Sequence, residues 1–140
     1  MINILIRIKG LINSMKKHII IKTQFTALHQ WSLCNIKKVK FLKELHRHIF
    51  FVKIKFIVKE NNRELEFFEC KNLIDSFINN KLLKPHINPN SSVCASLGNM
   101  SCEDIAETIL SFLQNKKLPV CYVSVFEDNE NGAEVLIDDQ

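Results

Sequence analysis

The stretch HRHIFFVKIKFIVK, residues 46–59, carries the clearest structural pattern in the chain. Every second residue from His46 to Val58 is a histidine or an apolar residue, and the positions between them hold Arg47, two lysines and three further apolar residues. Successive side chains of a β-strand point to opposite faces of the sheet. The stretch therefore predicts a long strand with one continuous apolar face.

The segments on either side supply the expected neighbours of this strand. Residues 17–29, KHIIIKTQFTALH, are rich in β-branched and aromatic residues and predict a strand that ends at His29. Residues 30–44 have no clean period and contain four lysines, which indicates a mobile loop or an irregular turn. After the long strand, the Asn-Asn pair at 61–62 is a turn signal, and residues 63–68 are expected to return as an antiparallel partner.

Two segments of the second half predict amphipathic helices. Between residues 70 and 82 the apolar positions are spaced three and four apart. Ser101 is expected to cap a second helix, because its hydroxyl can accept hydrogen bonds from the free amides of the first turn. Between them, residues 84–100 contain two prolines and Gly98, and predict a long loop of the kind that often carries function.

The end of the chain predicts a further hairpin. Residues 118–127 are strand-like, the Asn131-Gly132 pair is a turn signal, and residues 133–137 return. Because strands and helices do not alternate regularly, we expect an α+β fold with an antiparallel sheet and helices on one face.

Composition indicates one folded domain. The chain has 140 residues, of which 46% are hydrophobic and 24% charged, with only three glycines and three prolines. These values exclude a disordered, collagen-like or multidomain protein. The five cysteines form no C-x-x-C pair, and no secretory signal is present, so we expect a reduced, cytoplasmic protein.

Residues 1–14, MINILIRIKGLINS, are apolar but too short to span a bilayer, and Arg7 and Lys9 interrupt them. We therefore expect no membrane span and no membrane partner. Because Met15 offers a second plausible start, residues 1–14 are expected to be a dispensable extension of a domain that covers residues 15–140.

Charge is divided unequally along the chain. Residues 1–59 hold 13 basic residues and one acidic residue, whereas residues 60–140 hold 6 basic and 14 acidic residues. The basic half could attract a nucleic acid or a phosphorylated small molecule. The alternative is that the two halves pair inside one sheet or across a subunit contact. No repeat or aromatic-rich nucleic-acid signature is present, so a nucleic acid is the less favoured partner.

A candidate metal site lies at the start of the long strand. His46 and His48 project from the same face, about 6–7 Å apart along the chain, so both imidazoles can reach one ion. Catalytic zinc takes three protein ligands, and His29, at the end of a different strand, is the best-placed third. The alternative is that His46 and His48 are half-exposed residues near the rim of the sheet.

Five short motifs together resemble the family of the 6-pyruvoyltetrahydropterin and 6-carboxytetrahydropterin synthases. They occur in the family's order and with similar spacing over roughly residues 16–137. The motifs are FTALH at 25–29, HRH at 46–48, EFFECK at 66–71, SCEDIA at 101–106 and VSVFEDNENGAEV at 123–135.

The resemblance implies the tunnelling fold, a four-stranded antiparallel sheet with two helices on one face, in which trimers form a barrel and pair into hexamers. It also implies Zn²⁺ bound by His29, His46 and His48, and a pterin held by Glu127, whose carboxylate can accept two parallel hydrogen bonds. The alternative for Glu127 is a solvated acid at a strand end. The implied substrate is 7,8-dihydroneopterin triphosphate, on which zinc polarises oxygen while a base moves protons and triphosphate leaves.

The sequence departs from the family at its proton-transfer residues. The usual cysteine, four to six residues before the first histidine of the HRH motif, is absent, and Cys34 could replace it only if residues 30–44 fold back. Glu44 is a candidate general base, because a folate-related branch has a glutamate at a position offset by one; the alternative is a solvated acid. His86 matches the histidine of the family's Asp-His pair, but Pro85 stands where the aspartate should be.

Three classes of function therefore remain. The first is a zinc-dependent pterin synthase-like lyase with Glu44 or His86 as proton-transfer residues. The second is a catalytically reduced relative that binds a pterin or nucleotide-like ligand without turnover. A basic nucleic-acid-binding module is the third and least favoured.

Overall fold

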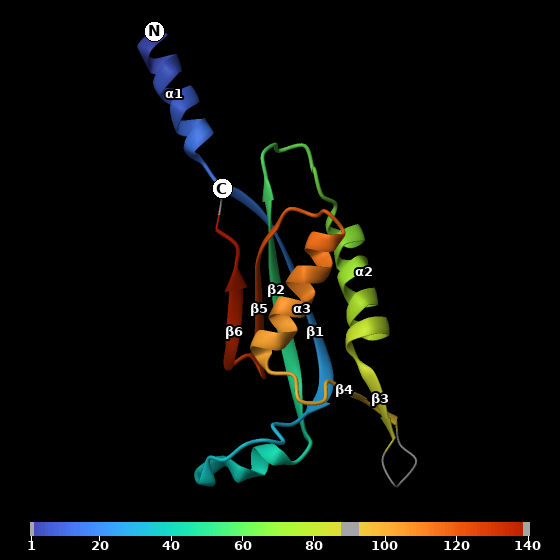
Figure 1. Ribbon diagram of the computed structural model, residues 1–140. Coiled ribbons are helices and arrows are strands. Elements are labelled where there is room, and N and C mark those ends of the chain that lie inside the picture. The colour runs from blue at the N-terminus through green and yellow to red at the C-terminus, as the bar shows by residue number, and fades with distance from the viewer. Residues whose placement is uncertain (1, 88–92, 139–140) are drawn as a thin grey trace.

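The computed structural model describes residues 2–87 and 93–138 and shows an α+β fold (Figure 1). The N-terminal half contains helix α1 (Ile2–Ser14), strand β1 (Lys17–His29), the 3-10 helix η1 (Lys37–Lys43) and strand β2 (His46–Val58). Then follow helix α2 (Phe67–Phe77), the π-helical turn η2 (Ile78–Leu82), and strands β3 (Lys84–Ile87) and β4 (Val93–Ser96). Helix α3 (Cys102–Asn115) and strands β5 (Val120–Glu127) and β6 (Asn131–Leu136) complete the chain.

The long alternating stretch forms β2, as predicted, at the centre of the sheet. It pairs antiparallel with β1 in an uninterrupted register that runs from Lys17 opposite Val58 to His29 opposite His46. Phe50, Ile54 and Phe56 on its apolar face have no exposed surface. The period-two pattern therefore identified both the strand and its buried face.

The sheet has more strands than the four expected, and not all of them are antiparallel. Six strands lie in the order β3-β4-β1-β2-β5-β6, and β1 pairs parallel with β4 through Leu28 and Ser96. The two extra strands come from residues 84–100, which were expected to be a loop. Pro85 fits there because β3 is the edge strand, where a missing backbone donor is tolerated.

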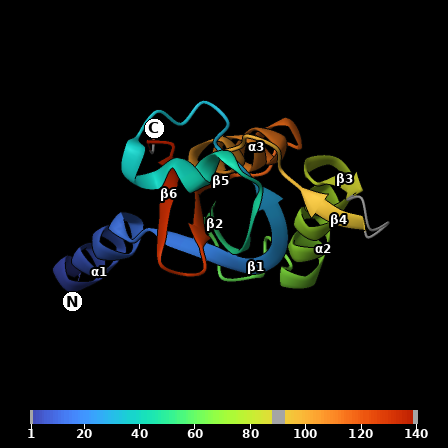
Figure 2. The ribbon, with the colours of Figure 1, turned by 90° about the horizontal axis from the view of Figure 1, so that it is seen from below.

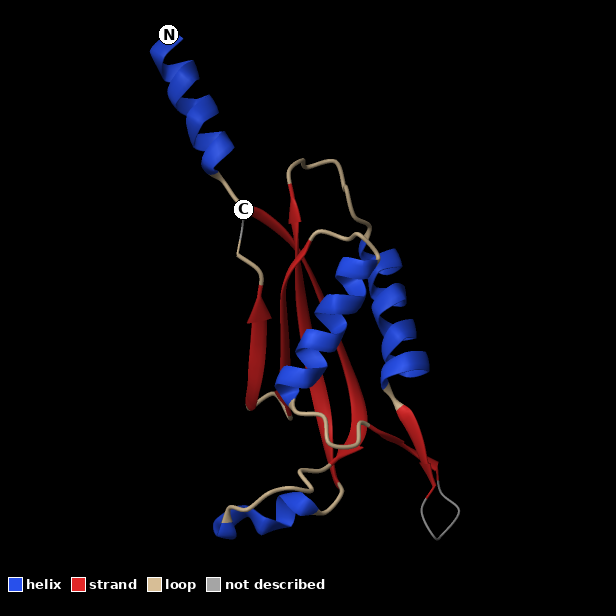
Figure 3. Cartoon of the chain, in the orientation of Figure 1, coloured by secondary structure: helices blue, strands red, loops and turns tan. Residues whose placement is uncertain are grey.

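Helices α2 and α3 pack side by side on one face of the sheet, as expected (Figures 1 and 3). The buried face of α3 contains Ile105, Ile109 and Leu113, none of which is exposed. Ser101 caps α3 as predicted: its Oγ accepts from the Asp104 amide, while the Asp104 carboxylate accepts from the Ser101 amide.

The predicted return strand at residues 63–68 is wrong. Glu66 instead caps helix α2, its carboxylate accepting hydrogen bonds from the amides of Phe68 and Glu69. Phe67 and Phe68 consequently lie in the first turn of the helix and are exposed. The cap satisfies amides that a helix start leaves without partners, which outweighs the weak alternation of the segment.

The final hairpin forms, but its turn lies earlier than predicted. Asp128 and Asn129 have positive φ angles of 52° and 58° and make the turn, whereas Asn131 and Gly132 begin β6. A Cβ at position 132 would collide with the carbonyl oxygen of Val125. Glycine is required there for close approach of two strands rather than for the turn.

Helix α1 and the 3-10 helix η1 lie at opposite ends of the structure (Figure 1). Figure 2, seen from below, shows η1 across the end of the sheet nearest the viewer. Among the described residues, no helix is both long and apolar enough to cross a bilayer.

Candidate metal centre

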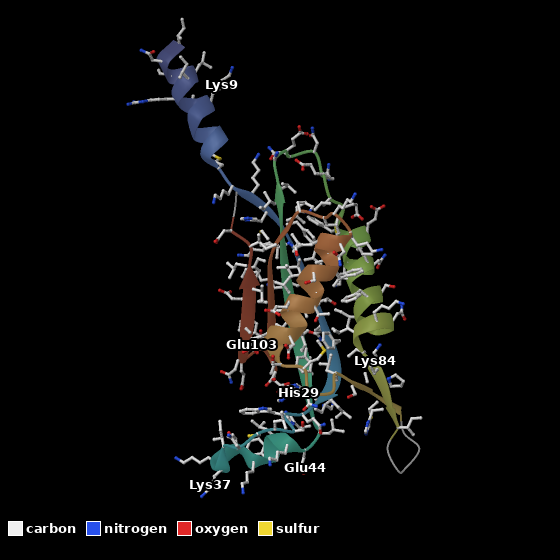
Figure 4. The ribbon with its side chains drawn as sticks, in the orientation of Figure 1. Lys9, His29, Lys37, Glu44, Lys84 and Glu103 are labelled. Carbon is white, nitrogen blue, oxygen red and sulfur yellow. The ribbon has the colours of Figure 1, made fainter. Side chains whose placement is uncertain are left out.

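Three histidines meet at the end of the sheet where β1 finishes and β2 begins. His29 pairs directly with His46 in the strand register, and His48 lies two residues further along the same face of β2. One ring nitrogen from each of the three lies within 4.8 Å of the others. Figure 4 labels His29 at this lower end of the sheet. The spatial arrangement on which the predicted metal site depends is therefore present.

All three rings use Nδ1 for contacts with the protein. His29 Nδ1 lies 3.1 Å from the Met100 carbonyl oxygen, and His46 Nδ1 lies 2.8 Å from the Glu44 carbonyl oxygen. His48 Nδ1 lies 2.6 Å from Asp128 Oδ2. Carbonyl and carboxylate oxygens only accept, so each Nδ1 carries a hydrogen, and in the neutral ring Nε2 is the atom with the free lone pair. Metal-binding histidines are characteristically oriented in this way.

His29 is the most buried of the three, with 7% of its surface exposed. Burial lowers the pKa of His29 below its usual value, although the hydrogen bond to Met100 and the charge of Glu127 oppose that shift. The ring is therefore neutral near pH 7. Its Nε2 is buried and has no hydrogen-bond partner. A buried acceptor without a partner costs free energy unless a hydrogen-bond donor or a cation contacts it.

The carboxylate of Glu127 lies beside the Nε2 atoms of His29 and His48. Glu127 Oε1 lies 3.2 Å from His29 Nε2, and Oε2 lies 3.5 Å from His48 Nε2. When both imidazoles are neutral and protonated at Nδ1, these nitrogen and oxygen atoms are all acceptors and repel one another. A divalent cation among them would turn the repulsion into coordination, and imidazole nitrogen with carboxylate oxygen suits Zn²⁺. The residues present therefore fit the expected metal.

A pocket of about 580 Å³ opens at His29 and His46. This volume is typical of small-molecule sites. Its wall comes from the ends of β1, β2 and β5, the start of α3, and the loop after β1. The lining residues include His29, His46, Glu127, Trp31, Leu42, Asn99, Met100 and Cys102.

The two predicted proton-transfer residues lie elsewhere. Neither Glu44 nor His86 is among the described residues that line the pocket. The Glu44 side chain is exposed, and only its backbone carbonyl reaches the site, through His46. His86 lies on the edge strand β3 opposite Cys94, two residues after Lys84, which Figure 4 labels. The structure thus gathers His29, His46, His48 and Glu127, and leaves Glu44 and His86 outside the pocket.

Sequence reasoning missed Asp128, which holds His48 in place. Its carboxylate accepts from the Ile49 amide through Oδ1 and contacts His48 Nδ1 through Oδ2. These contacts, led by the Ile49 hydrogen bond, lower the pKa of Asp128. The only signal in the sequence was an acidic residue directly after Glu127, at the end of a strand.

Cys102, not Cys34, is the thiol at the site. Cys102 Sγ lies 3.8 Å from Glu127 Oε1, and burial, followed by the charge of Glu127, raises the pKa of this thiol to about 12. It therefore stays protonated near neutral pH and is a poor nucleophile. Cys34 is buried within its own loop, where its sulfur lies 3.7 Å from the Val39 carbonyl oxygen.

Several solved structures have a fold similar to that of this chain. An uncharacterised protein from Wolinella succinogenes aligns with a TM-score of 0.60 and 15% sequence identity, over 89% of this chain and 100% of that one. The 6-pyruvoyl tetrahydropterin synthase of Plasmodium falciparum aligns with a TM-score of 0.53 and 17% identity, over 86% and 96%. The chain has the fold of these synthases.

A catalytic-residue mutant of the Plasmodium vivax 6-pyruvoyltetrahydropterin synthase, with alanine in place of a glutamate, aligns equally well. Its TM-score is 0.53, with 15% identity over 87% of this chain and 98% of that one. No family model and no curated protein sequence matches the chain. At these identities the likeness establishes the fold, and the site must be argued from its own chemistry.

Proposed function

We propose that this chain is a zinc-dependent lyase of the 6-pyruvoyl- or 6-carboxytetrahydropterin synthase type, acting on 7,8-dihydroneopterin triphosphate. The observation that carries the proposal is the convergence of His29, His46 and His48, with every Nδ1 already held by the protein. The shared fold supports the assignment to this class of enzyme.

In this proposal the three histidines hold Zn²⁺, which when bound would act as a Lewis acid on a side-chain oxygen of the substrate. Asp128 and the carbonyl groups of Met100 and Glu44 keep the imidazoles oriented. The pocket beside them has room for a pterin ring. Trp31 and Leu42 offer it apolar walls.

Glu127 is proposed to bind the pterin, as the family resemblance implies. Its carboxylate lies in the pocket wall, which supports the assignment, and a carboxylate can accept two parallel hydrogen bonds from the ring nitrogens. The short distances from Glu127 to His29 and His48 also make it a possible fourth zinc ligand when no substrate is bound.

Proton transfer is assigned to Glu44 or His86. In the reaction, a base removes a proton from a side-chain carbon of the substrate, and the triphosphate leaves with the electron pair of its carbon–oxygen bond. Glu44 is favoured, since it lies two residues before the ligand His46 and a glutamate is the catalytic residue altered in the Plasmodium vivax variant.

The second candidate is a relative that binds a pterin or nucleotide-like ligand without turning it over. The positions of Glu44 and His86, outside the pocket wall among the described residues, favour it. So does Cys102, the thiol at the site, whose raised pKa keeps it protonated.

The family resemblance further implies that the chain forms a homo-oligomer, up to a hexamer, with a domain of residues 15–140 as its unit. Sedimentation velocity on the purified protein tests this assembly. A species of about six times the 16.3 kDa chain mass is expected. A monomer at all concentrations would contradict it.

Release of triphosphate distinguishes the two candidates. The zinc-loaded protein is incubated with 7,8-dihydroneopterin triphosphate, and free triphosphate and bound pterin are measured together. Release supports the lyase, whereas a retained ligand without release supports the binder. If the zinc-loaded protein neither releases triphosphate nor retains the ligand, both candidates are wrong.

Substitutions then assign the roles within the lyase. Glu44→Gln is expected to lower the release rate by about 100-fold or more if Glu44 is the general base. His86→Ala tests the other assignment in the same assay. His18→Ala is the matched control, since His18 lies on the same strand as His29 but on the opposite face.

A further inference from the structure

Helix α1 is not part of the sheet, and none of its described residues lines the pocket at His29 and His46. It projects away from the rest of the structure beyond the far end of β1 (Figures 1 and 3). Its apolar side chains are nevertheless large and exposed: Ile4 is 62% exposed, Leu5 55%, Ile6 62% and Ile8 48%. Exposed side chains of this size, gathered on one short helix, indicate a binding surface.

Three of the exposed apolar side chains of the helix share one side, whereas Ile2 and Ile6 lie on the opposite side. Successive residues of an α-helix are about 100° apart, so Ile4, Leu5 and Ile8 lie on one side. Arg7 and Lys9, the two neighbours of Ile8 in sequence, flank this face on either side. Long basic side chains at such a boundary can keep their charges in water while their stems cover apolar surface.

The charges on helix α1 indicate what kind of partner it binds. Helix α1 carries Arg7 and Lys9 and no acidic residue, and the first acidic residue of the whole chain is Glu44. An apolar face bordered by cations is complementary to the headgroup and acyl boundary of an anionic bilayer. A protein partner would instead need a groove that matches both the shape and the charge of this one helix.

We propose that α1 is a peripheral membrane anchor that lies in the surface of an anionic lipid bilayer. Ile4, Leu5 and Ile8 enter the acyl boundary, and Arg7 and Lys9 contact lipid phosphates. At about 1.5 Å per residue, a 13-residue helix is about 20 Å long, short of the roughly 30 Å hydrocarbon core. It therefore lies on the membrane and does not span it. This proposal departs from the expectation of no membrane partner, which rested on a segment too short to span a bilayer.

Vesicle flotation with the full chain tests the proposal. The protein is mixed with phosphatidylcholine vesicles that do or do not contain one third phosphatidylglycerol. Binding to the anionic vesicles is expected, with little binding to the neutral ones and with a decrease as salt is raised. Equal binding to both kinds of vesicle, or none to either, would overturn the proposal.

Two isoleucines on opposite sides of the helix provide a matched pair of variants. Ile8→Asn removes an apolar side chain from the proposed face and should weaken the partition onto anionic vesicles about tenfold. Ile6→Asn makes the same change about 160° away around the helix and should weaken it clearly less. Both substitutions lower helix propensity equally. A difference in vesicle binding between the two variants therefore shows which side of the helix contacts the bilayer.

The same variants detect the competing occupant, a second copy of the chain. If α1 pairs with another α1, Ile8→Asn will lower the mass measured by sedimentation velocity and leave vesicle binding unchanged. That result, or equal loss of vesicle binding in the two variants, would overturn a membrane-binding face formed by Ile4, Leu5 and Ile8.

Discussion

Asp128 fixes the orientation of one proposed metal ligand, His48. Its two carboxylate oxygens make separate contacts, one to the Ile49 amide and one to His48 Nδ1. In Asp128→Asn only one oxygen remains to accept, so His48 loses its support or the turn loses its amide contact. We expect zinc affinity to fall about 10- to 100-fold, measured by competition with a chromophoric chelator. Glu130→Gln, which removes a charge from the same turn, should leave the affinity unchanged; an equal fall in both variants would contradict the assignment.

Cys102 should titrate far above an ordinary thiol. Its pKa of about 12 means that the reactive thiolate is scarce at pH 8 and increases as pH rises through that value. In the metal-free protein, alkylation by iodoacetamide should be slower at Cys102 than at the less buried Cys94, and should still rise above pH 9. Glu127→Gln removes a repelling charge and should accelerate it. Peptide mapping by mass spectrometry measures both sites, and rates at pH 8 that are equal for the two cysteines would refute the account.

The strands were largely predictable, because alternation along a strand is local information. β1 and β2 lie where the pattern placed them, and the helix capped by Ser101 begins as expected. The prediction for residues 63–68 was wrong because a single side chain, Glu66, stabilises a helix start that the weak alternation of these six residues cannot oppose. The β3–β4 hairpin lies at the sheet edge, where Pro85 and polar residues are tolerated and a strand looks like a loop.

The three histidines were predictable for the same reason, since parity and strand ends are visible in sequence. The groups that hold the histidines in place were not predictable. The Met100 carbonyl is 71 residues from His29, and Asp128 is 80 residues from His48. Such contacts depend on how β1, β2 and β5 lie beside one another. The proton-transfer residues were taken from family positions that this chain only partly matches, and neither lies in the described pocket wall.

The β5–β6 hairpin gives a test at the level of an element. Gly132 lies where its backbone approaches the carbonyl of Val125 too closely for any side chain. Gly132→Ala should therefore destabilise the protein by about 1–3 kcal/mol, as overpacking typically does, and lower the urea midpoint. Gly10→Ala is the control, because a Cβ at that position meets nothing within 4 Å. A midpoint unchanged by Gly132→Ala would contradict the close approach.

At the scale of the whole molecule, the sheet brings the site together from distant parts of the chain. The register sets His29 opposite His46 and Phe50 opposite Glu127, while α3 begins against the same end. The two charge halves also meet within this one sheet, since β1 and β2 from the basic half lie beside β5 and β6 from the acidic half. Charge pairing between halves is therefore possible without a nucleic acid.

The most direct test of the central claim is the zinc content of the metal-reconstituted protein. We expect one zinc per chain, measured by plasma mass spectrometry after removal of free metal, and loss of that zinc in His29→Ala, His46→Ala and His48→Ala. His18→Ala should retain it. Full zinc occupancy in all three site variants, or none in the unaltered protein, would contradict a metal centre built from these three imidazoles.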